Sequence, residues 1–296
     1  MTRVVVVAKR TNIARFVEEA HDPRVRLLLQ QRDPVVGRWQ SAHDEHLRTV
    51  DEVMRVLEAH GAHVVVIENP HVAFDTTDAD LVVTIGGDGT LLAASHDVGE
   101  APILGVNSAP RSSVGFYCAG HAGNVAALVP AALAGQAPSI RLERMQVTVD
   151  GGVRSRRVLN EALYCHASPA ATSRYIVRIG RRREEHRSSG FWVGPAAGST
   201  AAQRSAGGRV LPLDSRALQL VVREPYAAPG ERFKLLRAVV EPPGRIVVKS
   251  KMLEACMFLD GPYKRVDLAL GEEAVFSRSS EPLTVIGLGR RRARAR

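Results

Sequence analysis

The chain has 296 residues and is 45% hydrophobic, which is enough to bury the core of one large or two medium domains. No apolar run approaches the ~20 residues that cross a bilayer, and Lys9 and Arg10 end the first apolar run too early for a signal peptide. We therefore expect a cytoplasmic protein that does not enter a membrane. The formal net charge is +9, but arginines between 290 and 296 supply five of these charges and leave +4 for the body. This modest surplus suits anionic small molecules as well as nucleic acid.

The cysteines and the terminal arginines are further features of the composition. Cys118, Cys165 and Cys256 are odd in number, far apart and without CxxC spacing, which favours buried thiols over a disulfide framework or a zinc site. We predict no protein-ligated metal among the site residues. Residues 288–296 are predicted to form a basic, disordered tail, and contact of this tail with nucleic acid or an acidic surface remains an alternative.

Residues 1–138 are predicted to form an α/β domain. Apolar β-branched runs alternate with helical patterns, which indicates a parallel sheet with helices on its faces. Ser41 can cap the first firm helix, which Gly61 would stop. The apolar face of this helix is expected to contain Leu47, Val50, Met54 and Leu57. Strands are expected at 4–8, 63–67, 81–85 and 103–106.

The chain is organised around the glycine-rich turn that follows the strand at 81–85. Its residues are Gly86, Gly87, Asp88, Gly89 and Thr90. The glycines are expected to allow positive φ and to bring N–H groups close to a phosphate, with Thr90 capping the helix that follows. Asp88 is the odd member, because a carboxylate beside an anion needs a proton or a metal ion. An ordinary structural turn is the alternative.

Other polar residues of this domain are candidates because of their place in the sheet. Ligands of parallel sheets collect at the carboxyl ends of the strands, where both the glycine-rich turn and Asn107 are expected. Asn107 opens a polar loop that also contains Arg111, which we include as a lower-ranked site residue.

Residues 139–287 are predicted to form a β-rich, sandwich-like domain whose last strands return to the first domain. Short β-type runs are separated by turn signals. The strands are expected at 146–149, 158–164, 175–179, 191–193, 218–222, 246–248, 255–259, 266–270 and 283–286.

Two constellations of this second half can bind a nucleotide. Asn160 and Glu161 interrupt an apolar strand pattern, and an amide beside a carboxylate can bind a base edge and ribose hydroxyls. Ser199, Thr200 and Ala201 lie in a small-residue loop that lets a flat ligand approach the backbone. A satisfied buried polar pair and a close-packed Ala/Gly helix are the structural alternatives. Lower-ranked candidates are Ser189, Arg216, Arg223 and Asp260.

The order of these motifs resembles the NAD kinase family. The motifs that carry the resemblance are Gly86 to Thr90, Asn160-Glu161, Gly198 to Ala201 with Ser205 to Gly208, and Asp260-Gly261. The amino-acid sequence of the variable stretches is most similar to that of the plant-type NADH kinase branch. The resemblance implies an active site between two domains, with ATP and NAD(H) as substrates, Mg²⁺ as cofactor, and a homodimer or homotetramer assembled through the C-terminal domain.

The resemblance also implies roles for individual residues. The reaction would phosphorylate the 2′-hydroxyl of the adenosine ribose, and Asp88 would accept its proton. The three glycines of the turn would shape the phosphate site, and Asn160 and Glu161 would hold the adenosine and ribose groups. Thr200 and Ala201 would line the adenine pocket.

The sequence departs from the family pattern at several places. Ser189 stands where the family has Asp, Ala202 where it has Tyr, and Pro262 where it has Gln. These departures leave the preference between NAD⁺ and NADH open. Two other function classes are alternatives: a lipid or sugar kinase that shares only the glycine-rich turn, and a non-catalytic basic protein that binds nucleotides or nucleic acid.

Overall fold

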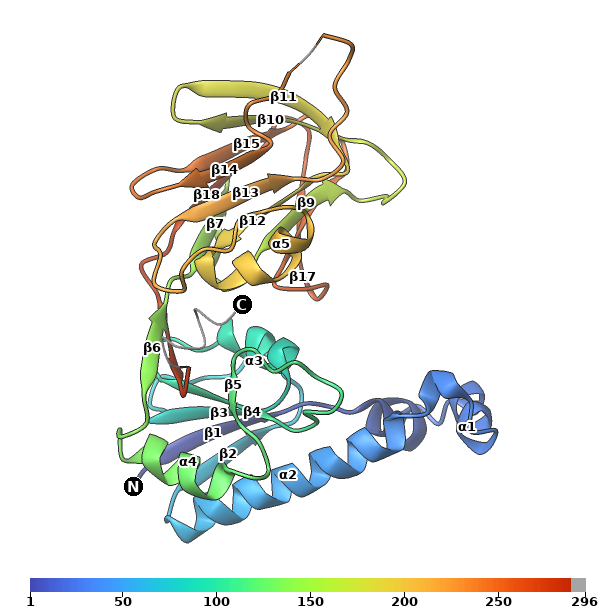
Figure 1. Ribbon diagram of the computed structural model, residues 1–296, viewed down its shortest axis with the longest axis vertical. Helices are drawn as coiled ribbons and strands as arrows, with labels where there is room; N and C mark the ends of the chain where they lie inside the picture. The colour runs from blue at the N-terminus through green and yellow to red at the C-terminus, as the bar shows by residue number, and fades with distance from the viewer. Residues whose placement is uncertain (231, 289–296) are drawn as a thin grey trace. The chain divides into compact units, whose positions relative to one another are not determined.

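The structure is a computed structural model that describes residues 1–230 and 232–288. The chain folds into two compact units (Figure 1). The first unit comprises Met1–Ile140 and the segment that begins at Thr284, and the second comprises Arg141–Leu283. The predicted tail at 288–296 lies outside the described residues, apart from Leu288, which is buried.

The first unit is built on a seven-stranded sheet in the order β2-β1-β3-β4-β19-β6, with β5 paired to β4. The pairs of β1 with β2 and β3, and of β4 with β3, β5 and β19, are all parallel. The expected mostly parallel α/β sheet is therefore confirmed. The strands are β1 (Arg3–Ala8), β2 (His63–Ile67), β3 (Leu81–Gly86), β4 (Ile103–Asn107), β5 (Cys118–Gly120), β6 (Ser139–Leu142) and β19 (Leu283–Ile286).

Helices cover both faces of this sheet. Two of them pack on one face through a shared core that includes Val53, Leu57, Val125 and Val129, and a third lies on the opposite face (Figure 1). The helices are α1 (Pro23–Gln30), α2 (Trp39–Ala59), α3 (Asp88–Ser95) and α4 (Val125–Leu133), with a π-helical turn at Ala14–Glu19 and a 3-10 turn at Pro34–Val36. No helix within the described ranges is long and apolar enough to cross a membrane.

The long helix α2 differs from its prediction in two ways. It begins two residues before Ser41, and the hydroxyl of Ser41 donates to the Arg38 carbonyl at 3.2 Å instead of capping the helix. Leu47 is 48% exposed, because the buried stripe of the helix runs through polar residues as well as through Val53 and Leu57. The hydrophobic pattern alone could not show that His43 and His46 face the interior.

The second unit is a sandwich of two six-stranded sheets, in the orders β11-β10-β15-β18-β7-β8 and β14-β13-β12-β9-β16-β17. All of the described pairs in both sheets are antiparallel, which confirms the β-rich fold. The strands are β7 (Met145–Val149), β8 (Gly152–Val158), β9 (Ala162–His166), β10 (Ser173–Ile179), β11 (Arg182–Ser188), β12 (Phe191–Pro195), β13 (Leu218–Val222), β14 (Arg237–Val240), β15 (Ile246–Ser250), β16 (Ala255–Leu259), β17 (Lys264–Leu268) and β18 (Glu273–Arg278).

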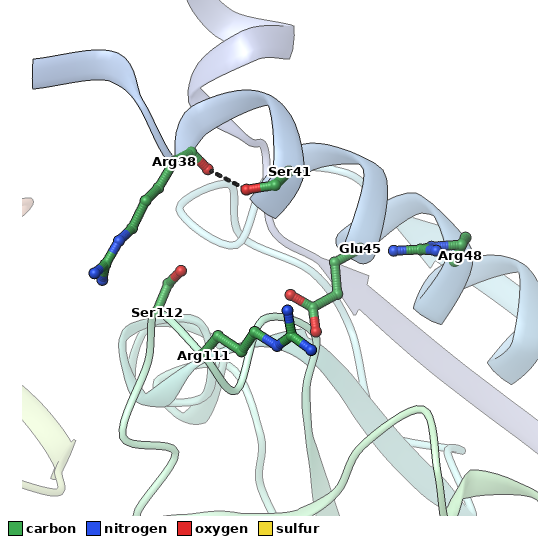
Figure 2. Close-up of a pocket in the computed structure, with 6 residues that line it drawn as sticks. All are labelled: Arg38, Ser41, Glu45, Arg48, Arg111 and Ser112. Atoms are coloured by element: carbon green, nitrogen blue, oxygen red, sulfur yellow. Dashed lines mark hydrogen bonds between the residues drawn. The ribbon is translucent and has the colours of Figure 1, made fainter. Parts of the chain in front are cut away.

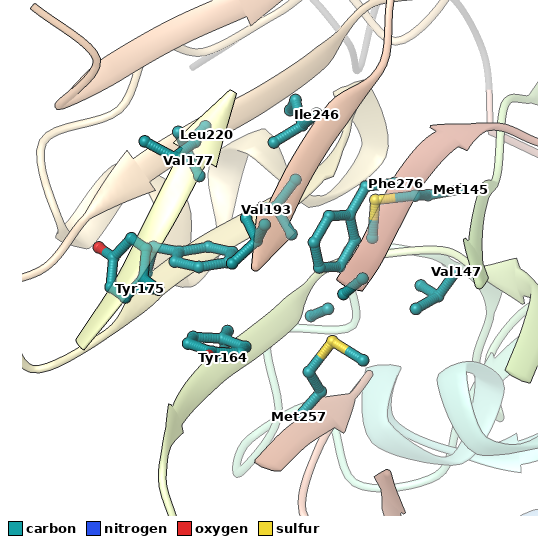
Figure 3. Packing of buried hydrophobic residues seen from close by; sticks show 14 of the residues in the cluster. Met145, Val147, Tyr164, Tyr175, Val177, Val193, Leu220, Ile246, Met257 and Phe276 are labelled. Atoms are coloured by element: carbon teal, nitrogen blue, oxygen red, sulfur yellow. The ribbon is translucent and has the colours of Figure 1, made fainter. Parts of the chain in front are cut away.

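Aromatic side chains from both sheets fill the core of the sandwich (Figure 3). Tyr164 stacks on Phe191 with ring centroids 4.9 Å apart, and Tyr175 meets both rings edge to face. Phe276 of the other sheet lies 6.0 Å from Phe191, which joins the two layers. Such pairs stabilise a core beyond the area that they bury.

The sequence missed four strands of this unit, and β11 shows why. Its sequence is rich in Arg and Glu because the strand lies at the edge of its sheet, where charged side chains reach solvent. The three cysteines are free thiols, as expected, although Cys165 is only half-buried. The sulfur atoms of Cys165 and Cys256 lie 3.8 Å apart on the paired strands β9 and β16.

Candidate active site

The glycine-rich turn of the first unit joins β3 to α3. None of its three glycines has a positive φ, so our expectation of left-handed backbone is wrong. Two of them are required by space. A Cβ on Gly86 would lie 2.1 Å from Oγ1 of Thr90, and a Cβ on Gly87 would lie 2.4 Å from Oγ of Ser113. Thr90 is the third residue of α3 rather than its cap, and its buried side chain packs beneath Gly86.

Asp88 is the first residue of α3 and its carboxylate is held by a second loop. The N–H groups of Phe116 and Tyr117 donate to Oδ2 and Oδ1, both at 2.8 Å. An ionised carboxylate offers about four acceptor positions, so roughly two remain open after these bonds. The start of a helix also favours a negative charge. Asp88 is therefore a fixed, half-buried hydrogen-bond acceptor with acceptor positions still open.

The neighbouring strands end beside this turn. Asn107 of β4 pairs with Gly86, and its side chain donates to the Ser113 carbonyl and accepts from the Ala109 N–H. Lys9 follows β1, and its Cβ would lie 3.1 Å from a Cβ on Gly86. Burial lowers the pKa of the Lys9 ammonium. The carboxyl edge of the sheet thus brings the turn, Asn107 and one cation together.

Helix α2 contributes a histidine to the same edge. Nδ1 of His46 lies 2.9 Å from Oγ of Ser108, the residue after β4. Burial, and then the nearby charges of Lys9 and His43, lower the pKa of His46 to about 4. The ring is therefore neutral at physiological pH, and it holds the polar loop against α2.

In the second unit, Asp260 organises the segment that carries Asn160 and Glu161. Its Oδ1 accepts from the N–H groups of Asn160 at 2.7 Å and Glu161 at 3.1 Å, and its Oδ2 accepts from Leu159 at 2.8 Å. The segment is a bend between β8 and β9, so the predicted single strand over 158–164 is wrong. Asp260 acts on its neighbours through the backbone.

Glu161 has an unusual electrostatic environment. The residue is half-buried, but its Oε2 is shielded from solvent, and no group in the described ranges donates a hydrogen bond to it. Burial and then the negative charge of Asp260 raise the pKa of Glu161 to about 8. A carboxyl group of this kind carries a proton at neutral pH and can donate to a ligand.

The small-residue loop packs directly on Asn160. A Cβ on Gly198 would lie 1.8 Å from the carbonyl oxygen of Asn160, and one on Gly194 would lie 2.1 Å from it. Ser199 is fully buried, and its hydroxyl donates to the Ala196 carbonyl and accepts from the Leu211 N–H. The loop forms the 3-10 turn Ala196–Thr200, followed by the short helix α5 (Ala202–Ser205).

Thr200 and Ala201 end this turn and are half-buried, so they stay accessible, whereas Ser199 is sealed in. Each unit therefore gathers one group of predicted residues: the turn with Asn107 in the first, and Asn160, Glu161, Asp260 and the 199–201 loop in the second.

Three of the lower-ranked residues of the second unit do not join that group. The Ser189 N–H donates to the Arg223 carbonyl, and Arg223 donates back to the Ser189 carbonyl. Ser189 precedes β12 and Arg223 follows its antiparallel neighbour β13, so the pair lies at the start of β12, whereas Asn160 lies near the other end of that strand. Arg216 faces Glu143 at 4.0 Å. In the first unit, Arg111 lines a separate cavity with Ser112.

Sequence reasoning also missed residues that build the two groups. Lys9 could have been identified as a candidate from the sequence, because it directly follows a parallel strand, as the glycine-rich turn does. Gln203 is buried and donates to the Asn160 carbonyl at 3.2 Å, and nothing in its local sequence marks it. Phe116 and Tyr117 act on Asp88 through backbone N–H groups, which any residue type supplies. In residues 1–230 and 232–288, no three His, Cys, Asp or Glu side chains gather into a metal site.

A space-limited glycine turn at the carboxyl edge of a parallel sheet, with one fixed carboxylate, defines a phosphate-handling class of α/β protein. Comparison with known proteins gives the family. The sequence profile of the ATP-NAD kinase N-terminal domain matches residues 4–137. The probable NADH kinase of rice (Oryza sativa subsp. japonica) is 32% identical over 263 residues, covering 81% of each chain. The NADH kinase of Arabidopsis thaliana is 32% identical over 70% of this chain and 73% of its own.

The fold is also similar to a solved structure. An NAD kinase from Archaeoglobus fulgidus, crystallised in complex with ATP, superposes with a TM-score of 0.71 over 99% of this chain and 96% of its own, at 21% sequence identity. The chain belongs to the NAD kinase family, and the resemblance predicted from its motifs is confirmed.

Proposed function

We propose that this protein transfers the γ-phosphoryl group of ATP to the 2′-hydroxyl of the adenosine ribose of NAD(H), giving NADP(H). Family membership supports the reaction class, and it does not favour a lipid or sugar kinase or a non-catalytic binding protein. The observation that carries the proposal is the carboxylate of Asp88, which two backbone N–H groups orient while acceptor positions stay open. Phosphoryl transfer needs a positioned hydroxyl and a group to accept its proton.

The residues of the first unit have complementary roles in this proposal. Asp88 takes the proton of the attacking hydroxyl. Gly86 and Gly87 keep the turn narrow, so that phosphate oxygens can approach backbone N–H groups, and Gly89 and Thr90 continue it as the first turn of α3. We assign these roles to the α/β half, residues 1–138.

The residues of the second unit are proposed to hold the acceptor. Asn160 and Glu161 bind the adenosine and its ribose, and Asp260 fixes the backbone that presents them. Thr200 and Ala201 line the adenine pocket, and Ser199 sets the shape of the loop from inside. We assign dinucleotide binding to residues 139–287, and we propose that a homodimer or homotetramer forms through this half.

The proposed cofactor is Mg²⁺, bound together with ATP. Mg²⁺ usually keeps several waters and binds through one or two carboxylates plus substrate phosphates, which fits a site whose turn offers the single carboxylate Asp88. When bound, the ion neutralises charge on the phosphates. The chain's own residues orient the hydroxyl and remove its proton.

The experiment is a kinetic assay of the purified protein with Mg²⁺-ATP and either NAD⁺ or NADH. We expect NADP(H), identified as the 2′-phosphate by an NADP-specific dehydrogenase, and loss of turnover when EDTA removes the metal. The ratio of kcat/KM for NAD⁺ and NADH gives the preferred redox form. Failure of a folded sample to form either product would refute the proposal.

A further inference from the structure

A cavity of about 550 Å³ lies in the first unit, between the start of α2 and the polar loop after β4. Its lining residues are Arg38, Ser41, Glu45, Arg48, Arg111 and Ser112 (Figure 2). The volume is within the range of small-molecule sites and is much larger than one phosphate group needs. Among the described residues, no aliphatic or aromatic side chain lines it, so it suits a charged chain better than a nucleobase.

The cavity is positively charged. Three arginines face one carboxylate, and Figure 2 shows Arg111 reaching toward Glu45 while Arg38 extends toward Ser112. In residues 1–230 and 232–288, the side chains of Arg38 and Arg111 make no hydrogen bond or ion pair. Arg48 donates only to the Asp44 carbonyl, at 3.3 Å. These guanidinium groups are available to an anionic ligand.

The charges are spread along the cavity rather than focused on one point. Arg38, which directly precedes α2, and Arg48 within it are ten residues apart, which corresponds to about 15 Å along a helix. Arg111 approaches from the loop on the other side. This spread of charge suits a linear polyanion better than a single phosphate or carboxylate.

The loop that carries Arg111 is also tied to the catalytic turn. The Ser108 N–H donates to the Gly86 carbonyl at 2.9 Å, and Ser113 lies against Gly87. Ser112, which lines the cavity, is the neighbour of Ser113. One short loop thus borders the cavity on one side and the glycine-rich turn on the other.

We propose that this cavity binds the phosphate chain of the phosphoryl donor, with Arg38, Arg48 and Arg111 as its ligands. The ligand chemistry is a condensed phosphate, which can be the triphosphate of a nucleotide or an inorganic polyphosphate. This inference rests on the proposed function, because it assigns the donor side of the same reaction. Glu45 limits the affinity through its negative charge.

The binding test uses inorganic tripolyphosphate and the full chain in a low-salt calorimetric titration. Arg38→Gln and Arg111→Gln should each weaken binding about tenfold, the effect of losing one charge-assisted hydrogen bond. Arg55→Gln is the matched control, because Arg55 is an exposed arginine of α2 that does not line the cavity. Glu45→Gln should tighten binding several-fold. AMP, which lacks a phosphate chain, should bind without any dependence on these arginines.

Kinetics then separate this inference from the proposed function. The arginine variants should raise KM for ATP about tenfold, with a smaller change in kcat and in KM for NAD(H). If tripolyphosphate supports turnover, polyphosphate is a donor; if it only competes with ATP, the cavity serves the nucleotide.

Two results distinguish failure of this inference from failure of the proposed function. NADP(H) formation with an unchanged KM for ATP and unchanged tripolyphosphate binding in the arginine variants would overturn the inference alone. Arginine-dependent binding of tripolyphosphate without any NADP(H) formation would refute the proposed function and leave the anion site in place.

Discussion

The two units treat a carboxyl group in opposite ways. Asp88 of the first unit accepts two backbone N–H groups and lies at a helix start, whereas Oε2 of Glu161 in the second unit is shielded and has no donor among the described residues. Asp260, which accepts three N–H groups, adds its negative charge beside Glu161. The difference teaches that environment, rather than residue type, sets the state of a carboxyl group: the Asp88 carboxylate accepts two hydrogen bonds, whereas burial and the charge of Asp260 favour the protonated form of Glu161.

The largest expected effect comes from removing the proton acceptor. Asp88→Asn keeps the size of the side chain, but its amide nitrogen cannot accept from a backbone N–H and cannot take the hydroxyl proton. We expect kcat to fall about 10²–10⁴-fold. Asp80→Asn is the control, because the Asp80 carboxylate also accepts one backbone N–H, from Arg3 at 2.8 Å, but lies away from the turn. Equal kcat values for the two variants would show that Asp88 is not the group that accepts the hydroxyl proton.

Crowding distinguishes Gly198 of the second unit from Gly89 of the first unit. Gly198→Ala drives a methyl group into the Asn160 carbonyl, at a built distance of 1.8 Å, so the backbone must move. We expect a loss of about 2–4 kcal/mol in the free energy of unfolding. Gly89→Ala, with no atom within 4 Å of the new Cβ, should be neutral or stabilise α3 by up to about 1 kcal/mol. Chemical denaturation of both variants checks the pair, and similar losses would contradict the crowding argument.

The raised pKa of Glu161 predicts a pH dependence of stability. Its folded pKa of about 8 exceeds the ordinary value of 4.5, so the folded state binds a proton that the unfolded state releases between these values. The contribution of Glu161 is complete below about pH 4.5 and is lost as pH rises through 8. Glu161→Gln should therefore gain stability relative to the natural protein by about 1.4 kcal/mol per pH unit in this window. The free energy of unfolding of both proteins is measured at pH 5, 6, 7 and 8. A difference between the two proteins that stays constant over these pH values would show that Glu161 is not protonated.

The smallest expected effect concerns the support of the first unit's site. Ser108→Ala removes the hydroxyl that meets Nδ1 of the neutral, buried His46. We expect a loss of about 1 kcal/mol in the free energy of unfolding. His43, whose Nδ1 lies 2.7 Å from Oγ1 of Thr11, offers a matched comparison, because Thr11→Val removes a similar bond nearer the start of α2. A change in KM for ATP should follow only Ser108→Ala, since that residue belongs to the loop beside the glycine-rich turn.

The glycine-rich turn could be predicted from the sequence because its signal is local. A β-branched run, a glycine cluster and a helix start lie within 15 residues of one another, and their order specifies strand, turn and helix. The reason for the glycines could not be predicted in the same way. Gly86 and Gly87 are required by Thr90 and by Ser113, and the second of these contacts joins residues that are far apart in sequence.

The bend that carries Asn160 and Glu161 shows the opposite case. The apolar residues on both sides of it continue a strand pattern, and the group that breaks the strand is Asp260, about 100 residues later. Local propensity cannot reveal such a partner. The order of motifs still singled out Asn160 and Glu161, because it depends on residue chemistry rather than on secondary structure.

The topology of the first unit has a consequence for how the protein is made. β19, which follows the entire sandwich in sequence, pairs with β4 and lies between β4 and β6. A ribosome therefore releases the sandwich strands before it releases the strand that completes the α/β sheet, although most of that sheet is synthesised first. A fragment that stops at residue 138 leaves the part of β4 around Ile103 without the partner that β19 supplies, and the nascent chain shares that exposed edge until β19 has been synthesised.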